Sequence, residues 1–331
     1  MNIAFFSCHP YEQPFLDAAN HNQRHTLTFL TDSLSDETVQ LATGHEAICV
    51  FVNDQLTRPV LMKLAELGIH LVALRCTGYN QVDVPAAREF GIRILRVPAY
   101  SPHAVAEHAV ALLLSLNRKT YLAYQRTKQN DFTLDGLMGF DLFGKRVGII
   151  GTGKIGAAFA RIMLGFGCRV LAHDKIRSAL LQQLGVEYLP LSELLAEADV
   201  VSLHCPLTPD THHLIDEAAL GQMKHGAYLI NTSRGGLLDT PAVLRALASG
   251  QVAALGIDVY ELEDDYFFAD WSDKPLPDTD LNALTHLPNV LLTSHQGFFT
   301  RDAMEQIAHT TLNNLTYLEQ QQLPADCIVV G

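Results

Sequence analysis

Short apolar runs rich in β-branched and aromatic residues alternate with helical patterns over the first hundred residues. Such runs are typical of buried strands, and their alternation with helices predicts a parallel α/β sheet. Residues 58–67, with helical periodicity, are one of the helices expected between strands. The expected strands are residues 3–6, 26–30, 47–52, 70–75 and 93–97.

The pattern changes at Ser101-Pro102, which suits a helix start, and residues 104–126 are expected to form one long helix. A second alternating series begins at Lys145. Its six expected strands are enough for a complete doubly wound nucleotide-binding sheet. These strands are residues 147–150, 170–173, 200–204, 228–231, 254–257 and 290–293.

The last amphipathic segment, residues 301–320, is too short to form a domain alone and is expected to pack on the first domain. We therefore predict a first domain made of residues 1–100 and 298–331, with residues 101–297 inserted as a second domain. The chain length of 331 residues agrees with two domains of about 150 residues each.

Composition and charge narrow the possible partners. The formal charge of −13 disfavours nucleic acid and anionic membranes, which select basic surfaces, but leaves room for a small anionic substrate held by a local arginine. The N-terminus lacks a signal peptide, and the longest apolar run, residues 109–116, is too short to cross a bilayer, so we expect a cytoplasmic protein.

The six cysteines are scattered, without a C-x-x-C pair, so neither a disulfide scaffold nor a metal site is expected. They are Cys8, Cys49, Cys76, Cys168, Cys205 and Cys327.

A glycine-rich motif, Gly151-Thr152-Gly153-Lys154-Ile155-Gly156, follows the apolar strand at 147–150 and opens the helical run at 157–166. In this context the motif predicts a dinucleotide site. Gly151 permits a tight turn, Gly153 lets the backbone approach a pyrophosphate, and Gly156 lets helix and strand pack closely.

Asp174 ends the next expected strand, 18 residues after Gly156 (174 − 156). A carboxylate at this place accepts hydrogen bonds from ribose hydroxyls and repels a 2′-phosphate, which favours NAD. Lys175 and Arg177 lie just beyond it and leave NADP open.

Three charged residues lie at or near the carboxyl ends of later strands, where open α/β sheets bind ligands. They are Arg234, Glu263 and His295.

With the glycine-rich motif, the segments around these three residues resemble the D-2-hydroxyacid dehydrogenase family, as do Cys76-Thr77-Gly78-Tyr79-Asn80 and Val97-Pro98-Ala99-Tyr100-Ser101-Pro102. The resemblance covers essentially the whole chain. It implies a Rossmann-like NAD domain inserted in a discontinuous, flavodoxin-like substrate domain. Three further segments look most like D-lactate dehydrogenases: Val105-Ala106-Glu107-His108, residues 202–208 and residues 266–270.

The resemblance implies NADH-dependent reduction of a 2-keto acid, pyruvate, to the D-2-hydroxy acid. His295 would be the general acid, because the reaction delivers a hydride to the carbonyl carbon and a proton to its oxygen. Glu263 would stabilise the imidazolium form and orient the ring. Glu261 lies in the same loop, but the family pattern places the catalytic carboxylate at the second of the two. Arg234 would hold the substrate carboxylate and polarise the carbonyl.

Other positions are carried over from the family pattern. For the substrate they are Tyr100, the backbone amides of Thr77 and Gly78, and Phe298, which with Phe299 would form an apolar wall. For the cofactor, besides the three glycines and Asp174, they are Lys154, Ile155, Cys205, Pro206, Thr211, Thr232, Ser233, Arg234 and Asp258. Cys205 is interpreted as a small lining residue, since the chemistry needs no thiol.

Three questions stay open at this point. The substrate could be a bulkier 2-keto acid or hydroxypyruvate, and the chain could instead be an NAD-sensing scaffold or corepressor. The long helix from Ala104 resembles the family's dimerisation element, which implies a homodimer or homotetramer. The hinge near Tyr100 and the return near Phe299 predict domain closure that excludes water.

Overall fold

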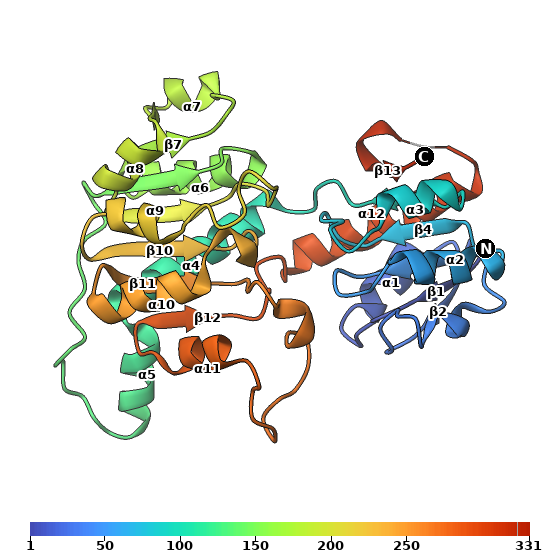
Figure 1. Cartoon of the computed structure of the whole chain (residues 1–331), viewed down its shortest axis with the longest axis horizontal. Coiled ribbons are helices and arrows are strands. Elements are labelled where there is room, and N and C mark those ends of the chain that lie inside the picture. The colour runs from blue at the N-terminus through green and yellow to red at the C-terminus, as the bar shows by residue number, and fades with distance from the viewer. Residues whose placement is uncertain (323) are drawn as a thin grey trace. The chain divides into compact units, whose positions relative to one another are not determined.

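The computed structural model describes residues 1–322 and 324–331 (Figure 1). By its internal contacts the chain divides into two compact units. Unit 1 consists of Met1–Ser101 and Phe298–Gly331, and unit 2 consists of Pro102–Gly297. Each unit has a sheet and hydrophobic cores of its own and is described by itself.

Unit 1 is built on a six-stranded sheet in the order β13-β5-β4-β3-β1-β2, parallel except for β13. Its strands are β1 (Asn2–Phe5), β2 (Thr26–Phe29), β3 (Ala47–Val50), β4 (Leu71–Leu74), β5 (Arg93–Arg96) and β13 (Ile328–Val330). Its helices are α1 (Gln13–Ala19), η1 (Val39–Ala42), α2 (Arg58–Glu66), α3 (Val84–Glu89), α12 (Arg301–Glu319) and η4 (Ala325–Cys327).

Helix α12 joins unit 1 although it comes near the end of the chain. The Thr300 hydroxyl accepts a hydrogen bond from Ala303 N and caps the helix. Leu312 and Leu315 of α12 share one hydrophobic cluster with Ile3 and other residues of β1 and β3. Figure 1 accordingly shows α12, in orange and red, beside the blue elements of unit 1.

A buried ion pair ties together the loops at the carboxyl end of the unit 1 sheet. Arg75 follows β4, is 1% exposed, and donates from Nε to Glu12 Oε1 at 2.8 Å. It also donates to the carbonyl of Ser7 at 2.7 Å, and the Phe51 ring lies against its guanidinium, 4.9 Å from the ring centre. The side chain of Arg75 therefore fixes the start of the loop that carries Thr77.

Arg75→Met is expected to lower the free energy of unfolding by about 3–5 kcal/mol, because it leaves the buried Glu12 carboxylate unpaired. Urea titration followed by circular dichroism would measure the loss. The matched control is Arg58→Met, which breaks the exposed pair with Glu89 and should change stability by less than about 1 kcal/mol. Equal effects of the two substitutions would contradict the structural role given to Arg75.

Unit 2 contains a fully parallel seven-stranded sheet in the order β12-β11-β10-β9-β6-β7-β8. Its strands are β6 (Arg146–Ile150), β7 (Arg169–His173), β8 (Glu187–Tyr188), β9 (Val200–Leu203), β10 (Ala227–Asn231), β11 (Val252–Ile257) and β12 (Val290–Leu292). The chain order reverses at β6, which pairs with both β7 and β9. This reversal is the place where doubly wound sheets bind ligands.

Helices cover both faces of this sheet. Alternate residues of β6 enter different clusters: Ile149 packs with residues of α4 and α6, and Ile150 with residues of α8, α9 and α10. The helices are α4 (Pro102–Arg118), α5 (Thr120–Lys128), α6 (Lys154–Gly165), α7 (Ala179–Gln183), α8 (Leu191–Glu197), α9 (Glu217–Gln222), η2 (Gly235–Leu237), α10 (Thr240–Ser249), η3 (Glu263–Asp265) and α11 (Thr279–His286).

The long helix predicted over residues 104–126 is wrong in one respect: it is two helices, α4 and α5, separated at Lys119. Lys119 has a left-handed φ of 48°, which an α-helix cannot contain. Its ammonium donates to the carbonyl of Gly136, and Asn117 donates to the carbonyl of Phe140. These two contacts are made with a later loop, and they terminate α4. A local sequence pattern cannot reveal them.

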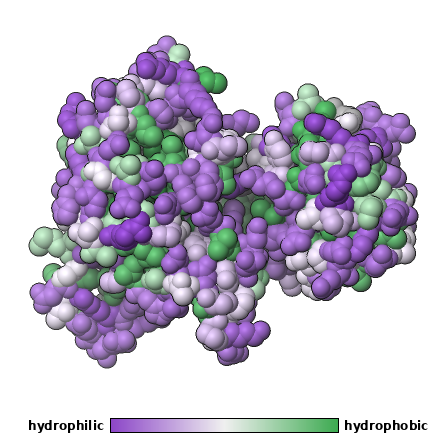
Figure 2. Space-filling model, in the orientation of Figure 1, coloured by the Kyte–Doolittle hydropathy of each residue, from purple (hydrophilic) through white to green (hydrophobic). Residues whose placement is uncertain are grey.

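The short strands β8 and β13 were not expected from the sequence, since neither exceeds three residues. Within the described part of the chain, none of the helices is both long and apolar enough to cross a membrane. The face shown in Figure 2 is mainly hydrophilic.

Candidate active site

The predicted site residues of unit 2 lie at one edge of its sheet. Because all seven strands are parallel, the loops that follow them meet at the same carboxyl edge. In sheet order, this edge carries His295 after β12, Asp258 after β11, Thr232 after β10, Cys205 after β9, Gly151 after β6 and Asp174 after β7.

The glycine-rich loop has two positions closed to any side chain and one that is open. A Cβ on Gly151, whose φ is +93°, would lie 2.5 Å from Cys205 N, and one on Gly156 would lie 2.0 Å from Gly151 O. A Cβ on Gly153 would meet none of the described atoms within 4 Å. Packing therefore explains the first two glycines, whereas Gly153 borders open space at the N-terminus of α6, where a phosphate group would bind.

Asp174 is held as an anion at the end of β7. Its Oδ2 accepts hydrogen bonds from Thr152 N at 2.6 Å and Thr152 Oγ1 at 3.0 Å, and its Oδ1 accepts one from Ile176 N. Burial by itself would raise the pKa of Asp174, but these hydrogen bonds outweigh it and lower the pKa below its ordinary value. Asp174 thus offers a negatively charged acceptor beside the glycine-rich loop.

Of the cationic residues next to this acceptor, Lys175 forms an ion pair with Asp210, with 3.1 Å between Nζ and Oδ2. The side chains of both residues are largely exposed. Lys154, at the first position of α6, is also exposed, and Ile155 is half-buried.

A hydrogen bond joins the loops after β9 and β10: Ser233 Oγ donates to the carbonyl of Cys205 at 2.7 Å. Within the loop after β9, Thr211 Oγ1 donates to the carbonyl of Pro206 at 2.7 Å. Burial raises the pKa of Cys205 to about 11, so its thiol is protonated at neutral pH. The buried hydroxyl of Thr232 has no hydrogen-bond partner among the described residues, and a polar ligand at this edge would satisfy it.

His295 and Glu263 form a short hydrogen-bonded pair at this edge. His295 Nδ1 lies 2.7 Å from Glu263 Oε1, and both side chains are mostly buried. A carboxylate only accepts, so Nδ1 carries the hydrogen and Nε2 is left for another partner. Glu263 Oε2 in turn accepts a hydrogen bond from Tyr260 N at 2.9 Å. The second of the two loop glutamates, and not Glu261, is therefore the partner of His295.

Asp258 anchors the loop that carries His295. It is 1% exposed, and it accepts hydrogen bonds from Thr293 Oγ1, Gln296 N and Gly297 N. His295 N donates to the carbonyl of Asp258, which holds His295 at a left-handed φ of +53°. A contact between Asp258 and the nicotinamide amide stays a prediction.

Sequence reasoning gave no role to His108 or Thr293, which complete this anchor. His108 Nε2, from α4, lies 2.9 Å from Thr293 Oγ1 and 3.2 Å from Asp258 Oδ1. The segment Glu107-His108 was recognised as typical of the family, but a motif does not show which strand-end residue it contacts.

Arg234 is connected through backbone contacts to the pair formed by His295 and Glu263. It is half-buried, and its NH1 donates to the carbonyl of Ser233. A Cβ on the following Gly235 would lie 2.0 Å from the carbonyl carbon of Tyr260, so the two loops touch closely. Arg234 is thus linked to Glu263 by a short series of contacts that passes through Tyr260.

The aromatic ring of Phe268 lies near the pair formed by His295 and Glu263. Its centre is 6.3 Å from that of the His295 ring, with an angle of 33° between the planes. Phe268 belongs to the acidic aromatic loop that the sequence singled out, but it was not predicted as a site residue. A large ring beside His295 lowers the local access of water.

The predicted substrate residues of unit 1 lie in three loops: Thr77 and Gly78 follow β4, Tyr100 follows β5, and Phe298 precedes α12. Thr77 and Gly78 are half-buried, and the carbonyl of Thr77 accepts a hydrogen bond from Arg96 NH1 at 2.7 Å. Tyr100 and Phe298 make an edge-to-face contact with 6.2 Å between ring centres, and Phe51 lies 6.0 Å from Phe298. Phe51 was not predicted to belong to this aromatic group.

Comparison with known proteins decides the family. The family model described as "D-isomer specific 2-hydroxyacid dehydrogenase, NAD binding domain" matches residues 110–297. The chain belongs to this dehydrogenase family. It is 49% identical over 330 residues to the 2-hydroxyacid dehydrogenase homolog 1 of Schizosaccharomyces pombe, covering 99% of each chain.

A relative with a more specific name is found both by sequence and by structure. This dehydrogenase is 48% identical over 320 residues to the D-lactate dehydrogenase of Escherichia coli, covering 97% of each chain. The solved apo-structure of D-lactate dehydrogenase from Escherichia coli superposes with a TM-score of 0.90 at 44% identity and complete coverage of both chains.

These findings confirm the predicted fold class and show that the dehydrogenase is an oxidoreductase with an NAD-binding domain. The observed groups fit that cofactor. Gly153 leaves space for a pyrophosphate, the anionic Asp174 suits ribose hydroxyls, and the unpartnered Thr232 hydroxyl offers a further polar contact.

Proposed function

We propose that this dehydrogenase interconverts pyruvate and D-lactate, with unit 2 binding NAD and unit 1 contributing the substrate loops. The 2.7 Å contact between His295 Nδ1 and Glu263 Oε1 carries the proposal, because it provides an oriented acid at the carboxyl edge of the NAD domain. Nearly full-length relatives named D-lactate dehydrogenase support the substrate.

His295 supplies and removes the proton. NADH, when bound, supplies the hydride that adds to the carbonyl carbon of pyruvate. As the carbonyl π bond breaks, its electron pair goes to oxygen, which takes the proton from Nε2 of the imidazolium. Glu263 stabilises the imidazolium through Nδ1 and keeps Nε2 in the donating position. The reverse reaction uses neutral His295 as the base.

Charged and polar groups orient the substrate in this proposal. Arg234 binds the carboxylate of pyruvate through its guanidinium and polarises the carbonyl, which aligns the carbon for hydride transfer. The backbone amides of Thr77 and Gly78 provide additional donors to the carboxylate. Tyr100 and Phe298 provide the apolar group that receives the methyl of the substrate.

The test is steady-state oxidation of NADH with pyruvate, hydroxypyruvate and branched 2-keto acids, followed by chiral analysis of the product. We expect the highest kcat/KM with pyruvate and D-lactate as the product. A clear preference for a bulkier keto acid or for hydroxypyruvate would identify that acid as the substrate in place of pyruvate. NADH binding without turnover on any of these acids would instead favour a scaffold or corepressor.

Asp174→Ala is expected to raise the efficiency of NADPH relative to NADH by about tenfold or more. The substitution removes a hydrogen bond to a charged group, worth about 1.5–3 kcal/mol, and the repulsion of a 2′-phosphate. Steady-state kinetics with each nucleotide would measure the ratio. The control, Glu187→Ala, removes an exposed acid on β8 and should leave the ratio unchanged; an unaltered ratio in Asp174→Ala would remove this residue from ribose recognition.

Glu263→Gln is expected to slow reduction about tenfold. A neutral amide stabilises the imidazolium form of His295 less than a carboxylate does. Steady-state oxidation of NADH with pyruvate would measure the loss. Glu261→Gln is the matched control, because Glu261 is not the partner of His295. A loss of rate in the control alone would assign the role of Glu263 to Glu261.

We further propose that the enzyme works in the cytoplasm as a homodimer or homotetramer. Large apolar side chains are exposed on unit 2 in α5 and the loop that follows it, which is the composition of a subunit interface. They are Tyr124, Phe132, Leu134, Met138 and Phe143. Sedimentation analysis would distinguish monomer, dimer and tetramer, and a monomer at micromolar concentration would contradict the proposal.

A further inference from the structure

Two histidines and a glutamate of unit 2 converge at a place that the proposed reaction does not use. His212 Nε2 and His213 Nε2 each lie 3.1 Å from Glu261 Oε1, and the three ligand atoms lie within 4.8 Å of one another. The two imidazole rings face each other with 3.9 Å between centres. We name these three residues the His–His–Glu cluster.

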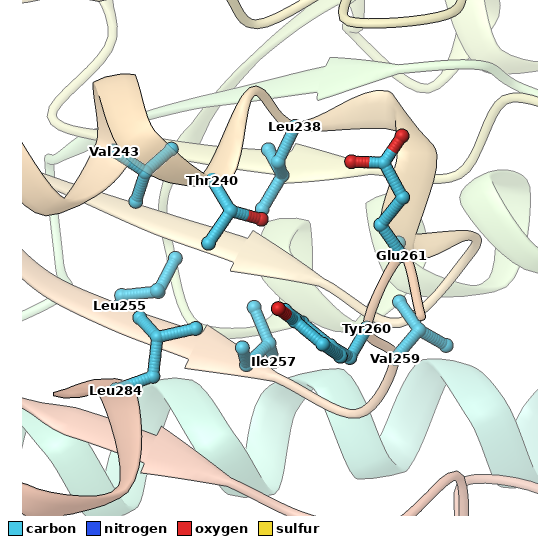
Figure 3. Close-up of a pocket in the computed structure, with 10 residues that line it drawn as sticks. Leu238, Thr240, Val243, Leu255, Ile257, Val259, Tyr260, Glu261 and Leu284 are labelled. Atoms are coloured by element: carbon cyan, nitrogen blue, oxygen red, sulfur yellow. The ribbon is translucent and has the colours of Figure 1, made fainter. Parts of the chain in front are cut away.

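The fold holds the cluster from two sides. His213 N donates to the carbonyl of Gly236, and His213 has a left-handed φ of +50°. Glu261 follows Tyr260, whose backbone touches Gly235, so the glutamate is fixed relative to the same short loop. Figure 3 shows the Tyr260 hydroxyl pointing into the apolar space near Leu255, while the Glu261 side chain extends away from that space.

The spacing of the ligand atoms suits one metal ion. Two ligands that are each about 2.0–2.1 Å from a tetrahedral zinc ion lie about 3.3 Å apart, close to the two observed separations of 3.1 Å. Two imidazoles with one carboxylate are a known donor set for zinc, with the fourth position open to water. The exposed fractions of the side chains, 51% for His212, 36% for His213 and 31% for Glu261, leave room for that water.

We propose that the His–His–Glu cluster binds a divalent transition-metal ion of the zinc type. Imidazole nitrogen selects zinc, copper, nickel and cobalt, whereas magnesium and calcium require mainly oxygen ligands. The protein's formal charge of −13 adds a general attraction for cations.

The alternative is that the histidines only donate hydrogen bonds to Glu261. The two cases differ in a measurable way, because a metal site requires all three ligands at once. Unit 2 also contains the mostly buried pair of His295 with Glu263, which could take up metal ions by itself. The experiment must therefore separate the cluster from that pair.

Calorimetric titration of the full-length enzyme without a polyhistidine tag, first stripped with a chelator, measures zinc binding in the absence of NADH and keto acid. We expect one saturable site per chain, and cobalt in place of zinc to give visible absorption bands of tetrahedral coordination. His212→Asn and Glu261→Gln should each weaken zinc binding at least tenfold. His225→Asn, which removes another exposed histidine of unit 2, and His295→Gln should retain it.

Unchanged zinc affinity in both His212→Asn and Glu261→Gln would overturn the proposal, as would weak uptake without saturation in the unaltered enzyme. Loss of binding in His295→Gln alone would assign the metal to the other pair. Circular dichroism verifies that each variant is folded. Zinc should also raise the thermal unfolding midpoint of the unaltered enzyme but not that of His212→Asn. None of these measurements depends on the proposed substrate.

Discussion

His295→Gln is expected to lower the turnover of pyruvate by roughly 100- to 10,000-fold, the contribution of a positioned general acid. Glutamine has no group that donates a proton near neutral pH. The backbone of residue 295 stays fixed by its hydrogen bond to the carbonyl of Asp258, so the loop is expected to keep its path. Steady-state and single-turnover oxidation of NADH would measure the effect.

His309→Gln is the control for this substitution, since His309 is an exposed residue of α12 in unit 1. The affinity for NADH, measured by fluorescence titration, should remain the same in both variants. Near-normal turnover in His295→Gln would refute the proposed acid. A large loss of NADH binding would instead show that the substitution disturbs the nucleotide site.

Arg234→Lys is expected to lower kcat/KM for pyruvate by about 10- to 150-fold. Lysine keeps the positive charge but loses the planar fork that binds a carboxylate through two hydrogen bonds. The loss corresponds to about 1.5–3 kcal/mol for a hydrogen bond to a charged group. Kinetics over a range of pyruvate concentrations would show both a higher KM and a lower kcat, because polarisation of the carbonyl is also weakened.

Arg245→Lys provides the matched control, because Arg245 forms an exposed ion pair with Glu217 on the surface of unit 2. It should retain the kinetics of the unaltered enzyme. If Arg234→Lys also retained full efficiency, the substrate carboxylate would have to be bound elsewhere, and the amides of Thr77 and Gly78 would be the remaining proposed donors.

Much of the fold was predictable because most of the strands are buried on both faces. Such strands appear in the sequence as nearly continuous apolar runs, and every expected strand from Ile3 to Val290 is present in one of the two sheets. Strands β8 and β13 are too short to give a recognisable run. The break between α4 and α5 also escaped prediction, since it depends on the contact between Lys119 and Gly136.

For the candidate site, the sequence was informative where chemistry imposes a pattern. The glycine-rich loop predicted the nucleotide site because it lies between an apolar strand and a helical run, with Asp174 at the end of the following strand. The choice between Glu261 and Glu263 rested on the family pattern, and only the 2.7 Å contact with His295 distinguishes them geometrically. His108 and Phe268 could not be predicted, because their contacts cross from other segments of the chain.

The sequence by itself determined the strand pattern, the nucleotide loop and the types of residue that the chemistry requires, since these depend on local periodicity and spacing. Tertiary structure alone showed the contact between Glu263 and His295, how Asp258 anchors the loop of His295, and that His212, His213 and Glu261 meet. The physical reason is that hydrogen bonds and ion pairs act over a few ångströms, whereas these partners lie tens of residues apart in the chain.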